Sequence, residues 1–184
     1  MAELRLVEPP RRAELRRAIR SRLVDLGLVL RTIAEDVLGA DSSIDWVGLD
    51  PQGGVVLVLV ADDTEDLALV ARALAQRAWV AARLRDWKQL APGLGLGPEA
   101  PVRVALLAPR FGAAAIAAAR ALGDPVAAIA TYRCVRNGGE VEILLEPVYT
   151  ETARGEPAVP TSSFRSGLCD ADLSLTDEER ADLG

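Results

Sequence analysis

The chain has 184 residues, of which half are hydrophobic and 26% are charged, and this predicts one ordinary globular domain with a substantial core. Its formal net charge of −6 disfavours non-specific attraction to a phosphate backbone. The sequence contains no histidine, which excludes Ser-His-Asp and Cys-His catalysis as well as histidine-ligated metals. The chemistry left to the chain is that of carboxylates, lysine, arginine or tyrosine.

Localisation and redox chemistry follow from what the sequence lacks. No apolar run approaches the roughly 18 residues of a membrane span, and the first residues include an acid and form no apolar leader. We therefore expect a cytoplasmic protein without a membrane partner. Cys134 and Cys169 have no Cys-x-x-Cys spacing, so two ordinary thiols are favoured over a disulfide or a zinc site.

The N-terminal third is predicted to form one long helix. After Pro9-Pro10, apolar residues recur at spacings of three and four from residue 11 to about residue 38, and Gly39 closes the pattern. Arginines dominate the polar positions of this region: Arg5, Arg11, Arg12, Arg16, Arg17, Arg20, Arg22 and Arg31. A local basic face on an acidic protein is the expected result.

A β-hairpin is predicted next, from Ile44–Asp50 and Val55–Val60 around a Pro-Gln-Gly-Gly turn. The second strand is apolar at every position, which predicts a strand covered on both faces. Asp50 precedes Pro51 and is expected to cap the turn.

The rest of the chain alternates helices and strands. We predict a helix over about 65–87, a Gly-rich loop over 91–101, a strand over 102–108, a helix over 113–122 and a hairpin of 126–134 with 140–146. Residues 1–150 are thus expected to form a single domain, followed by a loosely held tail over 151–184. Thr176 to Glu179 resembles a capping box that would open a short last helix.

This order predicts an α/β fold with one mixed sheet and helices on both faces. The segment from Ser43 to Ala61 resembles the metal-binding hairpin of the PD-(D/E)xK nuclease superfamily, in its RecB-like branch. There an Ile-Asp strand is followed, across a Gly turn, by Val-Val-x-Glu-x-Lys. Gln76 and Trp79 are similar to the Gln-x-x-x-aromatic helix of that branch, with the aromatic one residue early. The resemblance covers about residues 14–147 and implies a restriction-endonuclease-like fold.

The resemblance also implies where a metal site would lie and how this chain departs from it. The family holds Mg²⁺ between an Asp and a Glu, with a Lys two residues further on. Asp45 matches the first position, whereas Leu59 and Ala61 occupy the Glu and Lys positions. Because hydrocarbon cannot ligate a hard cation, this departure implies a pseudoenzyme with no metal or cofactor, in which Asp45 is a relic hydrogen-bonded at a strand end.

A relocated carboxylate is the alternative. Glu35, expected on the first helix, or Asp62, Asp63 and Glu65, expected beside the second helix, could approach Asp45 and restore a Mg²⁺ site. Asp62 and Asp63 also suit the N-terminal cap of that helix. The single lysine, Lys88, falls at the far end of the same helix.

The other singled-out side chains have a structural and a functional interpretation. Gln76 either lines a binding site or is a solvated helix residue, the latter being favoured. Trp46, Trp79 and Trp87 either stack on bases or anchor the core, and the core role is favoured.

Three hypotheses for function follow. The first is a catalytically inactive nuclease-like domain that binds a protein partner or a second copy of itself as a scaffold. The second is a Mg²⁺-dependent nuclease that uses Asp45 with a relocated carboxylate. The third is DNA binding without cleavage through the arginines of the first helix.

Overall fold

The computed structural model describes residues 5–62, 67–97, 99–137 and 140–150. Asp63, Glu65, Cys169 and the expected tail over 151–184 with its terminal helix lie outside the described residues. Among the described helices, none is long and apolar enough to cross a membrane.

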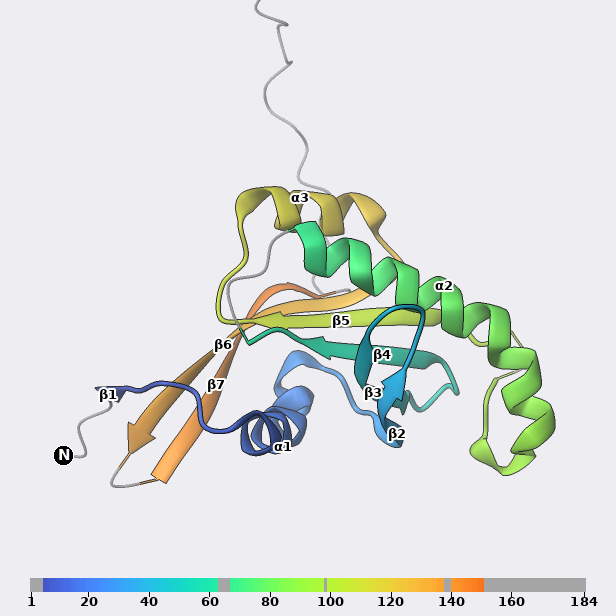
Figure 1. Cartoon of the computed structure of the whole chain (residues 1–184), viewed down its shortest axis with the longest axis horizontal. Coiled ribbons are helices and arrows are strands. Elements are labelled where there is room, and N and C mark those ends of the chain that lie inside the picture. Colours follow the sequence, from blue (N-terminus) through green and yellow to red (C-terminus); the bar gives the residue numbers. More distant parts are fainter. Residues whose placement is uncertain (1–4, 63–66, 98, 138–139, 151–184) are drawn as a thin grey trace, which may run out of the picture. The chain divides into compact units, whose positions relative to one another are not determined.

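A seven-stranded mixed sheet forms the centre of the fold (Figure 1). Its strands are β1 (Arg5–Leu6), β2 (Arg31–Leu38), β3 (Ser43–Leu49), β4 (Val55–Val60), β5 (Val102–Ala108), β6 (Val126–Asn137) and β7 (Glu140–Thr150). The order is β2-β3-β4-β5-β6, and β7 pairs along one edge of β6 while β1 pairs near the far end of β6. Strand β5 runs parallel to both β4 and β6, and the other pairs are antiparallel.

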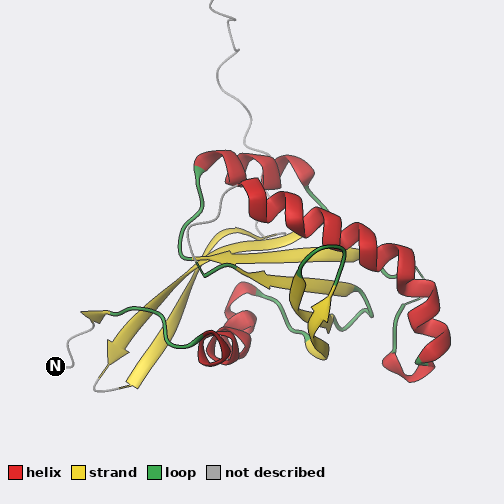
Figure 2. Ribbon diagram, in the orientation of Figure 1, coloured by secondary structure: helices red, strands yellow, loops and turns green. Residues whose placement is uncertain are grey.

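Helices cover both faces of this sheet, as predicted (Figure 2). Helix α1 (Arg12–Arg22) and the 3₁₀ turn η1 (Leu23–Leu26) lie on one face. Helices α2 (Leu67–Leu90) and α3 (Ala113–Leu122) lie on the other. A short 3₁₀ turn, η2 (Pro92–Leu94), follows α2.

Strand β4 separates two hydrophobic cores. Val56, Val58 and Val60 pack with Leu15 and Ile19 of α1. The alternate residues of β4 pack against the α2 and α3 face: Leu57, Leu59, Leu69, Ala73 and Ala115 belong to that core. The prediction of a strand covered on both faces is therefore confirmed.

The prediction of one long first helix is wrong. Helix α1 ends at Arg22, and Gly27 ends the following turn in the left-handed region with a φ of 74°. Its N–H donates to the Val24 carbonyl at 2.9 Å and thereby closes the helix C-terminus. Glu35 consequently lies in a strand and not on a helix.

The helix-like spacing beyond Gly27 arises from an irregular strand. The β2–β3 register shifts between Thr32 and Ala34, and Asp36 has a φ of 51°. Both features break the two-residue alternation of a strand, so Ile33, Ala34 and Val37 all pack against the same core. Irregular β structure thus produced the three- and four-residue spacing that was interpreted as helix.

The later elements follow the sequence prediction closely. Strand β5 and helix α3 have the expected bounds. The β6–β7 hairpin is present with Asn137 opposite Glu140, but both strands are longer than predicted. Pro147 does not end β7, because β7 is an edge strand and a register shift accommodates the ring nearby.

Candidate functional site

Asp45 lies where the β3–β4 ladder ends. The last paired residues are Trp46 and Val58, and beyond them the Asp45 carboxylate accepts the Val60 N–H at 2.7 Å. The residue is 3% exposed, and Asp45 is thus the hydrogen-bonded strand-end carboxylate that was expected.

Two arginines of α1 approach the same carboxylate. Arg12 Nη2 and Arg16 Nε each lie 3.1 Å from Asp45 Oδ1, and Arg16 Nη2 donates to the Asp45 carbonyl at 2.8 Å. The Arg16 guanidinium also lies over the Trp46 ring, 5.4 Å from its centroid. Burial raises the pKa of Asp45, although the Val60 N–H and both guanidinium groups act in the opposite direction.

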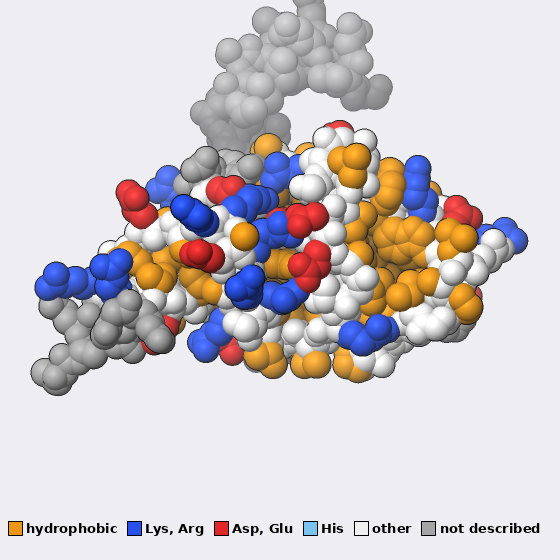
Figure 3. All heavy atoms as spheres, turned by 60° about the horizontal axis from the view of Figure 1, so that its bottom comes forward, with side chains coloured by type: hydrophobic (Ala, Val, Ile, Leu, Met, Phe, Trp, Pro, Cys, Tyr) orange, Lys and Arg blue, Asp and Glu red, His pale blue; other side chains and the backbone are white. Residues whose placement is uncertain are grey.

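The arginine face of α1 is paired with carboxylates of the sheet side. Arg12, Arg16 and Arg20 recur every four residues and therefore share one face of the helix. They form ion pairs with Asp62, Asp36 and Glu35 respectively. Figure 3 shows basic and acidic side chains interleaved on the side of the molecule that carries α1. Much of the predicted basic face is therefore neutralised from within the chain.

The Arg12 guanidinium lies between three groups that carry acceptor oxygens. Its guanidinium contacts Asp45, the Val60 carbonyl at 3.4 Å and Asp62. Oxygen atoms of this kind are the ligands that Mg²⁺ prefers. Within the described residues, no three His, Cys, Asp or Glu side chains come close enough to hold a metal ion. The donor set that the chain does assemble is occupied by a guanidinium.

A cavity of about 220 Å³ opens beside Asp45. Leu59 and Ala61 line it together with Ser42, Ser43, Asp62 and Arg72. Continuing the β3–β4 register by one step places Leu59 opposite Asp45. Asp45, Leu59 and Ala61, which stand at the Asp, Glu and Lys positions of the resemblance, therefore line one cavity, and two of the three are hydrocarbon.

The proposed rescue carboxylates divide into three cases. Asp62 is brought next to Asp45 through Arg12, whereas Glu35 lies on β2 and is engaged by Arg20. Asp63 and Glu65 lie outside the described residues. Asp36, which pairs with Arg16, was missed because its strand was interpreted as helix. Lys88 lines a different cavity with Ala91 and Leu96.

Gln76 is fully buried, so the favoured interpretation of a solvated helix residue is wrong. Its Oε1 accepts the Ala40 N–H at 3.0 Å, and its Nε2 donates to the carbonyl and the hydroxyl of Ser42 at 3.0 and 2.8 Å. A Cβ at Gly39 would lie 1.6 Å from Gln76 Oε1, so any larger residue there would push the buried Gln76 amide out of place. Gln76 thereby holds the β2–β3 turn, from which Ser42 and Ser43 reach the cavity.

The tryptophans contribute to the core, as predicted. Trp46 is buried on the α1 side, and Trp79 and Trp87 are partly buried against the core under α2. Arg83 lies over the Trp79 ring at 4.1 Å from its centroid.

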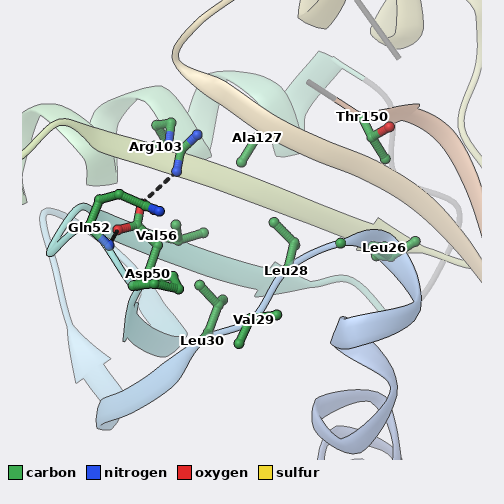
Figure 4. Close-up of a pocket in the computed structure, with 12 residues that line it drawn as sticks. Leu26, Leu28, Val29, Leu30, Asp50, Gln52, Val56, Arg103, Ala127 and Thr150 are labelled. Atoms are coloured by element: carbon green, nitrogen blue, oxygen red, sulfur yellow. Dashed lines mark hydrogen bonds and ion pairs between the residues drawn. The ribbon is translucent and has the colours of Figure 1, made fainter. Parts of the chain in front are cut away.

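A second aspartate–arginine pair lies at the other end of β4. Asp50 Oδ1 accepts the backbone N–H groups of Gln52 and Gly54 at 2.9 and 2.7 Å, which confirms the predicted turn cap. Its Oδ2 accepts a hydrogen bond from Arg103 of β5 at 2.7 Å. This pair borders a cavity of about 240 Å³ (Figure 4).

Comparison with known protein families gives no match, and neither does comparison with curated proteins. Among solved structures, a repair endonuclease from Pyrococcus abyssi is similar over 62% of this chain and 45% of its own, at 17% identity and a TM-score of 0.46. EndoMS in a complex with double-stranded DNA is similar over 60% of this chain and 41% of its own, at 18% identity and a TM-score of 0.42. This chain therefore spans less than half the length of either structure, and similarity at this level does not establish shared activity.

Proposed function

We propose that this chain is a nuclease-like domain that acts by binding a protein partner and does not cleave nucleic acid. The motif resemblance of residues 43–61 supports the nuclease-like part. So does the arrangement of α1 and α2, which flank the sheet on opposite faces as the resemblance implies.

The observation that carries the proposal is the position of Arg12. Its guanidinium bridges Asp45 and Asp62 and reaches the Val60 carbonyl, so a permanent cation of the chain neutralises the oxygens that a metal would use. Arg16 adds a second positive charge at Asp45. A divalent ion would have to displace Arg12 and would then experience repulsion from Arg16.

A protein partner is favoured over DNA by the distribution of charge. Three arginines of the α1 face already pair with carboxylates of the same chain, and the net charge is −6. Contacts to phosphate would require those ion pairs to open in a field that repels the nucleic acid.

One observation favours the Mg²⁺-dependent nuclease as a second candidate. Asp45 and Asp62 contact the same guanidinium, so both lie within reach of a single cation. In that case the two carboxylates and the Val60 carbonyl would hold the metal, which would polarise a phosphate and supply hydroxide. No described lysine lies beside them.

Calorimetric titration with Mn²⁺ separates the two candidates. The proposal expects no saturable binding to the wild-type chain and no Mg²⁺-dependent nicking of a plasmid. It also expects the double variant Arg12→Met, Arg16→Met to acquire binding, because this variant frees the oxygens and removes the remaining repulsion, while Arg17→Met, at an exposed position of the same helix, serves as the control. Saturable binding to the wild type that Asp45→Asn abolishes would establish the second candidate instead.

A salt series with duplex DNA tests the choice of partner. The proposal expects no binding by fluorescence anisotropy at low salt. Binding that weakens steeply with salt, and weakens further in Arg17→Met, would show that the chain binds DNA through its remaining exposed arginines.

A further inference from the structure

A second cavity lies at the N-terminal ends of β4 and β5. It is separate from the Asp45 cluster, which consists of Asp45, Arg12, Arg16 and Asp62, and it is lined by different residues. Its floor is formed by Val56 and Ala127, which are buried, and the linker Leu28–Leu30 forms one wall. Figure 4 shows Asp50, Gln52 and Arg103 gathered at one end and Leu28 and Ala127 across the middle. The cavity thus combines an apolar body with a polar end, which is the usual composition of a small-molecule site.

One wall of the cavity is the segment between the 3₁₀ turn η1, which ends at Gly27, and strand β2. Gly27 adopts a φ of 74°, which ends the turn, and residues 27–30 then line the cavity. Ala127, on the floor of the cavity, contributes only a methyl group and so leaves space above it. Val29 is 59% exposed and stands at the rim, where it also borders two neighbouring cavities.

Charge selects the kind of molecule that would fit. Among the described residues that line the cavity, the charged ones are Asp50 and Arg103, which pair with each other at 2.7 Å. The Asp50 carboxylate also accepts two backbone N–H groups, so its hydrogen-bonding capacity is largely used. A charged ligand would lose its hydration without gaining a counter-ion, whereas a neutral one would not.

The polar end selects the functional group. Gln52 lines the cavity with a side-chain amide, which both donates and accepts hydrogen bonds, and the Arg103 guanidinium only donates. A carboxamide, a lactam or a ureido group offers the complementary pair of a carbonyl oxygen and an N–H. An apolar ring or short chain attached to it would cover Val56 and Ala127.

We propose that this cavity binds a small neutral molecule that joins an apolar ring or short chain to an amide-like group. The site is independent of the Asp45 cluster, so it stands whether or not the chain cleaves nucleic acid.

Three probes of one size test the proposal on the full isotope-labelled chain by NMR titration: benzamide, benzoate and benzylammonium. Benzamide is expected to bind saturably and to shift the signals of Gln52, Arg103 and Ala127. Its charged analogues should bind at least about fivefold more weakly, which corresponds to about 1 kcal/mol.

Two variants locate the site. Ala127→Leu fills the floor and should weaken benzamide at least about tenfold, whereas Ala117→Leu on the exposed face of α3 should leave it unchanged. Gln52→Ala alters only a rim side chain, so it should weaken benzamide without affecting the fold even if Ala127→Leu proves unstable. Absence of saturable binding, equal binding of a charged analogue, or unchanged binding by Gln52→Ala and a folded Ala127→Leu would each overturn the proposal.

Discussion

Strand β3 begins near the buried Asp45 and ends near the partly buried Asp50, and both aspartates pair with arginines, yet the two ends of the β3–β4 hairpin differ. Asp45 is engaged by two arginines of a helix, so its ion pairs fasten α1 to the sheet. Asp50 is engaged by Arg103 of the neighbouring β5, so its ion pair lies along the sheet and leaves the space above it open. The same pair of residue types joins a helix to the sheet at one end and links strands within the sheet at the other, and a cavity lies beside each.

The largest expected effect separates these two aspartates. Asp45→Ala would leave the Val60 N–H without its acceptor and would leave Arg16, which is largely buried, with only the exposed Asp36 as a counter-ion, and we expect a loss of about 3 kcal/mol in the free energy of unfolding. Asp50→Ala should cost about 2 kcal/mol, because the turn loses its cap and Arg103 is more exposed than Arg16. Urea denaturation measures both. A larger loss for Asp50→Ala would contradict the comparison, and Asp62→Ala, at an exposed ion pair, should cost less than about 1 kcal/mol.

The turn that carries Ser42 to the Asp45 end should depend on the pair Gly39 and Gln76. Gly39→Ala would place a methyl group against the Gln76 amide and should destabilise the chain by about 2 kcal/mol. In a Gln76→Ala background the same substitution should cost much less, since the clashing amide is gone. A double-mutant cycle by urea denaturation provides the coupling energy. Additive losses would show that the two residues do not act on each other.

The pH dependence of stability should report Asp45. Because its pKa is raised in the folded chain, the folded state binds this proton more tightly than the unfolded state. Stability from this group is therefore fully present below its ordinary pKa of 3.8 and is lost as the pH rises through the raised folded value. The wild type should lose stability relative to Asp45→Asn over that rise. If the wild type instead gained stability relative to Asp45→Asn as the pH rises, the arginines would outweigh burial in setting the pKa of Asp45.

The smallest effect on stability is expected at Ala127, which lines the cavity beside Asp50. Ala127→Leu should change the free energy of unfolding by less than about 1 kcal/mol, because the cavity accommodates the added methylenes. The neighbouring Ala128 belongs to the same hydrophobic core as Ala127 but does not line the cavity, so Ala128→Leu should cost about 1–3 kcal/mol by overpacking. Thermal and urea unfolding compare the two. Equal losses would mean that the space above Ala127 is closed in solution.

Local patterns were sufficient for much of the fold. The β3–β4 hairpin, β5 and α3 were predicted because apolar runs and turn residues specify them within a few positions of the chain. The Asp50 cap was predicted for the same reason, since its backbone partners lie two and four residues away. Strand β2 was mistaken for helix because a register shift and the positive φ of Asp36 imitate helical spacing.

The sequence by itself determined the mixed α/β architecture and the hydrocarbon at Leu59 and Ala61. Only the tertiary structure decided that Arg12 stands between Asp45 and Asp62, and that Gln76 is buried beneath the β2–β3 turn. Periodicity reports which face of an element is apolar, because that preference acts between near neighbours. The partner of a buried charge or amide depends on which elements meet in space, and its position along the chain carries no such information.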